Sequence, residues 1–296
     1  MSAHKSIIVL SEKSSGSSAF QNLLSGFANI QHVLKTRHFE NETLYWTKAA
    51  SILGMPQLHM VDSEVPIGQK KARADLIALL EENLDGYTPP SDDRELVIGG
   101  WRRLCERYSP IFLEKSPHHL CQWSALELII ECMDELPAVD FLLVGLIRNP
   151  MDTIYSQYRR WRSSPEKVER QWLVAYRNLL RLKEVAGERL VIVRYEEMIS
   201  SLDHLKPVLD FCGCSADALD PTYLHRKSVS QWKSDALFGF APSQEVIDLA
   251  RSYGYRPEQL RHERTLFWPV IREFSRARHK ALVPLRNIAR FALKKT

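Results

Sequence analysis

The clearest signal of secondary structure in this chain is the segment Leu142-Leu143-Val144-Gly145-Leu146-Ile147-Arg148-Asn149-Pro150-Met151-Asp152-Thr153-Ile154-Tyr155-Ser156. Its first half continues an apolar run that begins at Phe141, which is typical of a strand buried on both faces. The run stops at Arg148-Asn149-Pro150, where proline presets the backbone for a first helical turn. The stretch therefore predicts a strand, a sharp polar turn and a helix from Met151 to about Trp161.

The same alternation extends outward along the chain in both directions. Further strands are predicted at four short apolar runs: Ile7–Leu10, Leu96–Ile98, Ile111–Leu113 and Leu190–Val193. Helices are predicted after residue 18, from Ser116-Pro117, and from Pro165 to about Val185. Strands alternating with helices indicate the α/β class, with a parallel central sheet covered by helices on both faces. Ligands of such sheets bind beyond the carboxyl ends of the strands.

The loop after the first strand reads Ser-Glu-Lys-Ser-Ser-Gly-Ser-Ser over residues 11–18. A small-residue loop that leads into a helix binds anions, because free backbone N–H groups and the helix dipole face the ligand. Lys13 adds a positive charge, and Gly16 allows close approach of the backbone. The loop lacks the Gly-Lys-Ser/Thr of nucleotide-triphosphate loops. A plain serine-rich turn is the alternative.

These two regions together resemble the sulfotransferases that use 3'-phosphoadenosine 5'-phosphosulfate (PAPS), with motifs closest to the glycan and heparan types. In that family an apolar strand, Arg-[Asn/Asp]-Pro-x-Asp and a later Ser bind the 3'-phosphate, which implies this role for Arg148 and Ser156. The resemblance also implies the P-loop-like sulfotransferase fold, with PAPS bound across the ends of the first and fourth strands.

The loop at residues 11–18 is similar to the family's 5'-phosphosulfate loop. The resemblance implies that PAPS contacts Lys13, Ser14, Ser15, Gly16, Ser17 and Ser18. The family places its basic residue directly before the Ser-Gly pair, whereas Lys13 stands one position earlier. Either Lys13 reaches the leaving phosphate, or another lysine such as Lys115 replaces it.

Three further stretches resemble the same family. Leu190–Met198 is similar to a strand whose Tyr lies near the adenine, which implies that role for Tyr195. Arg226-Lys227-Ser228, followed by Trp232-Lys233, resembles a signature that grips the 3'-phosphate, although Ser replaces Gly and the spacing is one residue short. Phe112–Pro117 resembles the Glu-Lys-Ser/Thr-Pro string of glycan sulfotransferases.

An acceptor hydroxyl needs a general base within hydrogen-bond reach. The run His38–Trp46 resembles a Glu-Asn-Glu string of heparan-type enzymes whose second Glu is the base, which implies Glu42 and leaves Glu40 and His38 as alternatives. In the small-molecule enzymes a His follows a Lys-Thr pair. His118 is the counterpart here, displaced by one residue.

Charge is distributed unevenly along the 296 residues, whose net charge is +4. Residues 261–296 carry a net charge of +8, so residues 1–260 carry −4. We expect a sulfotransferase domain over 1–260 and a basic amphipathic helical extension over 261–296. The extension docks on the domain, on an anionic membrane surface or beside an acidic polymer, or forms a solvated face.

Cysteine content and hydropathy indicate the cellular compartment. Five cysteines form neither a disulfide framework nor a zinc pattern. No run reaches the ~18 apolar residues of a membrane span, and the apolar run near the start is too short for a signal peptide. These features predict a cytoplasmic protein.

The expected activity is transfer of a sulfuryl group from PAPS to a hydroxyl or amine acceptor. The acceptor is a small molecule or a glycan, and the Glu-Asn-Glu and Glu-Lys-Ser-Pro strings favour a carbohydrate. No nucleic-acid partner and no metal are expected. The alternatives are a nucleotide-dependent kinase with a variant phosphate loop and a non-catalytic, anion-binding member of the fold.

Overall fold

The computed structural model describes residues 4–224, 228–235, 237–261, 270–271, 273–275 and 277. The chain divides into two compact units. The first comprises Met1–Ile147 and Val174–His225, and the second comprises Arg148–Leu173 and Arg226–Thr296. The expected extension at 261–296 lies almost wholly outside the described residues.

The first unit is built on a five-stranded sheet in the order β2-β3-β1-β4-β5. Every neighbouring pair of strands is parallel. The strands are β1 (His4–Ser11), β2 (Ile30–Gln31), β3 (Ile111–Lys115), β4 (Val139–Ile147) and β5 (Leu190–Arg194). The central strand β1 is fully buried from Ile7 to Leu10, as its unbroken apolar run predicts.

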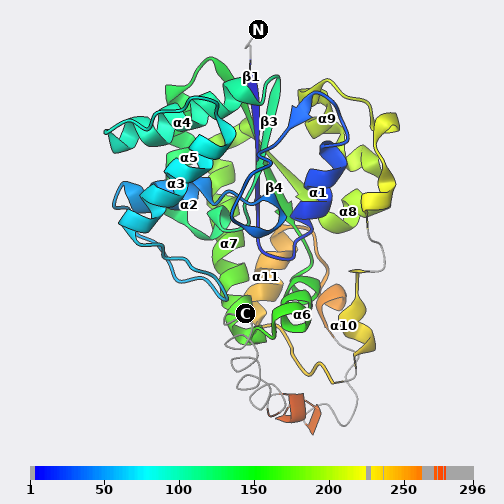
Figure 1. Ribbon diagram of the computed structural model, residues 1–296. Helices are drawn as coiled ribbons and strands as arrows, with labels where there is room; N and C mark the ends of the chain where they lie inside the picture. The colour runs from blue at the N-terminus through cyan, green and yellow to red at the C-terminus, as the bar shows by residue number, and fades with distance from the viewer. Residues whose placement is uncertain are drawn as a thin grey trace, which may run out of the picture. The chain divides into compact units, whose positions relative to one another are not determined.

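Helices cover both faces of this sheet (Figure 1). One side carries α2 (Tyr45–Ile52), α3 (Gln69–Asn83), α4 (Asp93–Arg107) and α5 (Trp123–Glu135). The other carries α1 (Ser17–Leu24), α8 (Tyr195–Ser200) and α9 (Lys206–Cys212). The long helix α7 (Pro165–Ala186) has residues in both units. The α/β fold with a parallel, doubly covered sheet is therefore confirmed.

Two local predictions are wrong. Leu96–Ile98 belongs to α4 and not to a strand. The apolar spacing continues to Trp101 and Leu104 at helical intervals, and the Asp92 side chain caps the helix by accepting a hydrogen bond from the Glu95 N–H. Asp92 thus marks the start of a helix.

The second wrong prediction is the helix start at Ser116-Pro117. A short 3₁₀ turn, η2 (His119–Cys121), intervenes, and α5 begins at Trp123. Ser116 cannot cap α5, because its hydroxyl accepts hydrogen bonds from the backbone N–H groups of Thr43 and Leu44, at 3.1 and 3.0 Å.

The second unit contains α6 (Pro150–Trp161), α10 (Gln231–Ser234) and α11 (Gln244–Ser252). Pro150 occupies the first turn of α6, as the sequence predicts, and the structure adds a cap from the Asn149 side chain. Tyr155 and Tyr158 of α6 pack on Phe238, with ring centroids 4.8 and 5.3 Å apart, and form an aromatic core.

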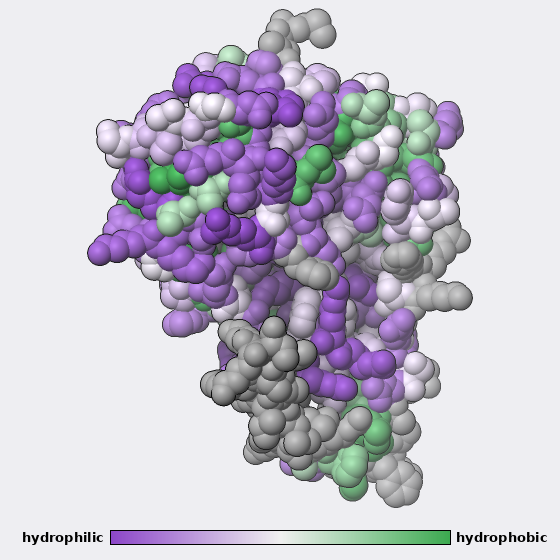
Figure 2. All heavy atoms as spheres, viewed as in Figure 1, coloured by the Kyte–Doolittle hydropathy of each residue, from purple (hydrophilic) through white to green (hydrophobic). Residues whose placement is uncertain are grey.

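The viewed surface over α3 and α4 is mainly hydrophilic, with separate apolar side chains (Figure 2). Among the described residues, no helix is both long and apolar enough to span a bilayer. All five cysteines are free thiols, and only Cys214 is not fully buried.

Candidate active site

The loop at residues 11–18 joins β1 to α1 through two left-handed residues, Ser14 (φ 64°) and Gly16 (φ 92°). The Ser15 N–H closes a turn onto the Glu12 carbonyl at 3.2 Å. Helix α1 starts at Ser17 without any side-chain cap. Because first-turn N–H groups have no intrahelical partner, this end of α1 offers donors and a positive dipole to an anion.

Position 16 requires glycine for two reasons: its backbone is left-handed, and the Tyr195 ring occupies the space that a side chain would need. A Cβ on Gly16 would lie 2.3 Å from the Cδ2 of Tyr195, the first residue of α8. The aromatic ring therefore packs directly on the loop. Gly16 of the loop and Tyr195 of α8, both expected to meet PAPS, are in contact in the first unit.

Gly16→Ala should raise the dissociation constant for 3'-phosphoadenosine 5'-phosphate (PAP) at least about tenfold, since it displaces Tyr195 and strains the loop. Gly54→Ala is the matched control, because Gly54 also has a positive φ (70°) but nothing within 4 Å of a Cβ. Calorimetric titration with PAP should show a loss for Gly16→Ala alone. Equal losses in both variants would mean that the Tyr195 contact is irrelevant to binding.

Lys115 lies beside Ser18, the last serine of the loop at residues 11–18. It ends β3, its side chain is fully buried, and its Nζ is 3.3 Å from the Ser18 Oγ. The same Nζ is 3.1 Å from the Glu40 carbonyl and 3.4 Å from Glu42 Oε1. A cation is thus fixed beside the N-terminal end of α1.

Lys13 has different partners. Its Nζ donates to the carbonyls of Val61 and Asp62, at 2.9 and 3.0 Å. Burial lowers the pKa of Lys13, and the nearby Glu12 opposes that effect. Lys13 therefore ties the loop at residues 11–18 to the segment around residue 61, while Lys115 contacts the loop serine.

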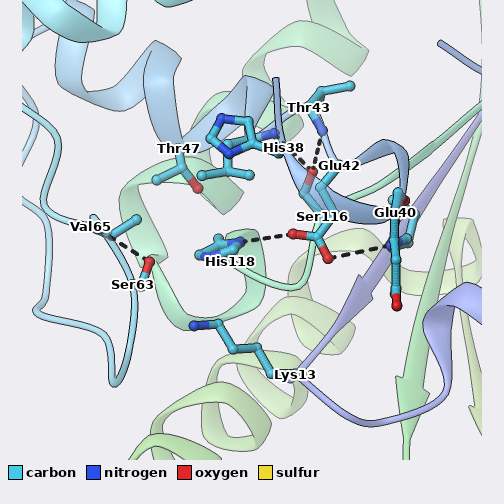
Figure 3. A network of polar contacts seen from close by, with 12 residues as sticks. Lys13, His38, Glu40, Glu42, Thr43, Thr47, Ser63, Val65, Ser116 and His118 are labelled. Atoms are coloured by element: carbon cyan, nitrogen blue, oxygen red, sulfur yellow. Dashed lines mark hydrogen bonds and ion pairs between the residues drawn. The ribbon is translucent and has the colours of Figure 1, made fainter. Parts of the chain in front are cut away.

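Glu42 and His118, two alternative candidates for the base, lie together (Figure 3). Glu42 Oε2 is 3.8 Å from His118 Nδ1, and Glu42 Oε1 faces Lys115. Burial raises the pKa of Glu42, although Lys115 partly offsets this. Burial, reinforced by the Lys13 charge, lowers the pKa of His118 well below its usual range. Burial therefore favours the neutral form of this imidazole.

The other two base candidates have other partners. His38 Nε2 lies 3.6 Å from Glu64 Oε1. The Glu40 carboxylate accepts a hydrogen bond from the Ser18 hydroxyl, and the Glu40 backbone carbonyl accepts one from Lys115. Glu40 therefore helps to hold the loop, and Glu42 is the carboxylate that faces His118.

Ser15 differs from the other loop serines. Its buried hydroxyl pairs with the Tyr176 hydroxyl at 2.9 Å, and Tyr176 in turn donates to the Leu146 carbonyl at 3.1 Å. The Ser15 side chain thus anchors the loop to α7 and β4. The sequence could not predict this role for Tyr176, because an aromatic residue at helical spacing is typical of the hydrophobic core.

In the second unit, two stretches assigned to the 3'-phosphate lie side by side. The buried Arg148 guanidinium donates to the Ser228 carbonyl at 2.7 Å, across 80 positions of sequence. Asp152 accepts a hydrogen bond from the Ser230 N–H at 2.7 Å. Ser156 is half-buried, two turns along α6. Arg226 and Lys227 lie outside the described residues.

Comparison with known proteins decides the family. The model of the sulfotransferase family matches residues 6–218, more than half of the chain. This chain belongs to the sulfotransferase family. No curated protein sequence matches it significantly.

Two solved sulfotransferase domains have a similar fold. The domain of the Synechococcus olefin synthase is 17% identical, with a TM-score of 0.55 over 86% of this chain and 97% of that one. The domain from the curacin biosynthetic pathway is 16% identical, with a TM-score of 0.54 over 86% and 98%. The sulfotransferase fold and the family together support sulfotransferase activity. Lys115 lies beside Ser18 and faces Glu42, which in turn faces His118.

Proposed function

We propose that this sulfotransferase transfers the sulfuryl group of PAPS to a hydroxyl or amine acceptor. The observation that carries the proposal is the buried Lys115 ammonium, placed 3.3 Å from the Ser18 hydroxyl and next to the Glu42–His118 pair. A cation for the leaving phosphate and a proton acceptor for the nucleophile are thus adjacent.

The first unit's residues fit an anionic donor. Helix α1 has no side-chain cap, and the Lys115 ammonium lies beside Ser18 in its first turn. The Tyr195 ring, packed on Gly16, would lie near the adenine. In the second unit, Arg148 and Ser156 would bind the 3'-phosphate, for which a guanidinium fork is well suited.

PAPS, when bound, supplies the sulfuryl group and departs as PAP. The acceptor oxygen or nitrogen forms a bond to sulfur as the bond from sulfur to the 5'-phosphate oxygen breaks. The acceptor's proton passes to the Glu42–His118 pair, whose imidazole is neutral beforehand. Lys115 stabilises the negative charge that develops on the phosphate oxygen, in a site where burial strengthens the interaction.

The acceptor we propose is a carbohydrate. Side chains that suit a hydroxyl-rich molecule, His38 and Ser63, lie around His118 together with Lys13 (Figure 3). The Glu-Asn-Glu and Glu-Lys-Ser-Pro strings support the same acceptor class. Incubation with sulfur-35-labelled PAPS and a panel of glycans, steroids, phenols and amines tests it, and label appearing only on a non-carbohydrate would reject it.

Titration with PAP tests the donor. PAP should raise the melting temperature more than ATP, because only PAP has a 3'-phosphate. Arg148→Ala should weaken PAP binding by about 2–3 kcal/mol and Ser156→Ala by about 0.5–1.5 kcal/mol. Arg159→Ala, on the exposed side of the same helix, is the control and should leave affinity unchanged.

Three outcomes would contradict parts of this proposal. Unchanged PAP affinity in Arg148→Ala rejects the 3'-phosphate assignment. Preference for ATP favours the kinase alternative. Binding of PAP without label transfer to any acceptor favours a non-catalytic, anion-binding protein.

A further inference from the structure

The segment that presents Glu42 has a strained backbone. Glu40, Asn41 and Leu44 all have left-handed φ angles, of 56°, 57° and 52°. Residues with a Cβ avoid this region, and a bulky apolar side chain such as that of Leu44 has no local hydrogen bond to offset the strain. Such strain persists only where the surroundings hold the backbone in place, and it concentrates at functional sites.

A buried acceptor holds this segment at its C-terminal end. The Ser116 hydroxyl oxygen accepts from two consecutive backbone N–H groups, those of Thr43 and Leu44, at 3.1 and 3.0 Å. Ser116 directs its own proton to Glu114 Oε1 at 2.5 Å. Both lone pairs of the Ser116 hydroxyl therefore accept from the two residues that immediately follow Glu42.

Glu114 is the centre of this network. Its Oε1 also accepts from the Thr43 hydroxyl at 2.6 Å and lies 3.4 Å from His119 Nε2. Glu114 and His119 are both fully buried, and His119 Nδ1 is 3.0 Å from the Thr47 hydroxyl. Burial alone raises the pKa of Glu114, but His119 and the hydrogen bonds from Ser116 and Thr43 outweigh it and lower the pKa.

The network and the catalytic residues come from the same strand end. Glu114 and Lys115 are consecutive in β3, so their side chains point to opposite faces. Lys115 contacts the Glu42 carboxylate, while Glu114 acts through Ser116 on the backbone that follows it. The end of β3 thus holds both the Lys115 ammonium and, through Ser116, the Glu42 carboxylate that faces this ammonium.

We propose that Glu114 and Ser116 are positioning residues, which clamp the strained segment 40–44 and so hold the Glu42 carboxylate between Lys115 and His118. The inference rests on the proposed function for its catalytic consequence. It assigns a role to a buried carboxylate that touches neither donor nor acceptor. The clamp itself is a property of the backbone amides of Thr43 and Leu44, which can be measured without turnover.

The first experiment removes each hydroxyl separately. Ser116→Ala and the isosteric Thr43→Val should each lower kcat about ten- to a hundredfold, because small displacements of catalytic groups are costly. The KM for PAPS and the affinity for PAP should remain unchanged. Thr43→Ser, which keeps the hydroxyl and loses only the methyl group, should restore most of kcat.

Ser51→Ala is the matched control. Ser51 is buried in the neighbouring helix α2, and its hydroxyl makes only a long 3.5 Å bond to the Thr47 carbonyl. Its loss should leave kcat unchanged. An equal fall in kcat for Ser51→Ala and Ser116→Ala would show a general effect of lost buried hydroxyls and would overturn the proposal.

Amide hydrogen exchange separates this proposal from the proposed function. Exchange at Thr43 and Leu44 should accelerate at least about tenfold in Ser116→Ala, and be unchanged in Ser51→Ala. Unchanged exchange overturns the clamp whatever the activity. A wild-type protein that transfers no sulfuryl group overturns the proposed function, while accelerated exchange would still support the clamp. If Ser116→Ala fails to fold, the kcat of Thr43→Val and its amide exchange at residues 43 and 44 test the clamp instead.

Discussion

Glu42→Gln is expected to lower kcat by about a hundred- to ten-thousandfold, the usual contribution of a general base. Gln keeps the shape of the side chain but removes the charge that faces Lys115 at 3.4 Å and His118 at 3.8 Å. His118 would then lose the carboxylate that stabilises its protonated form, so the pair could no longer take the acceptor's proton. PAP affinity should not fall, because the substitution removes a negative charge that would repel this anionic ligand.

The matched control is Glu64→Gln, since Glu64 is a partly exposed carboxylate in the same region that pairs with His38 instead. It should retain close to the wild-type kcat. The informative contrary result is an active Glu42→Gln enzyme combined with an inactive His118→Ala enzyme. His118 alone would then be the base, the enzyme would be closer to the small-molecule branch, and the carbohydrate acceptor would be rejected.

Lys115→Met should lower kcat by about a hundred- to a thousandfold, the cost of removing one preorganised group that stabilises developing charge. The Met side chain preserves most of the buried volume, so the loss measures the ammonium. The effect on kcat should exceed the effect on PAP affinity, because the charge on the leaving oxygen appears only during transfer.

Lys13→Met provides the comparison. Its ammonium is bound to the carbonyls of Val61 and Asp62, so we expect a smaller loss of kcat than for Lys115→Met. Thermal melting of both variants shows whether the fold survives. A larger kcat loss for Lys13→Met would return the leaving-group role to Lys13 and reduce Lys115 to a partner of Glu42.

Most of the sheet could be predicted because its strands are locally encoded. Runs such as Ile7–Leu10 and Phe141–Ile147 are apolar on both faces, which only a buried parallel strand accommodates over so short a length. The run Leu96–Ile98 misled for the same reason, since three apolar residues fit a strand or a buried helix equally well. Its helical continuation through Trp101 and the Asp92 cap decided the outcome.

The pieces of the candidate site were also visible in the sequence, but their partnerships were not. Glu42 and His118 were alternatives because each resembles the base of a different branch of the family, and 76 positions separate them in the sequence. The tertiary structure makes them neighbours, since Ser116 binds the backbone directly after Glu42 and thereby brings the two segments together. No local pattern reports such a contact.

The α/β class, the serine-rich loop after β1 and the Arg148–Ser156 motif could be recognised from the sequence, because each depends on neighbouring residues and on backbone preferences. Which lysine lies beside Ser18 depends instead on how the strands pair. Parallel pairing sets Lys115 opposite Val9, two residues before β1 ends, so the end of β3 lies beside the start of the loop. Lys13, although part of that loop, extends to another segment, because side-chain direction depends on the path of the loop and not on position along the chain.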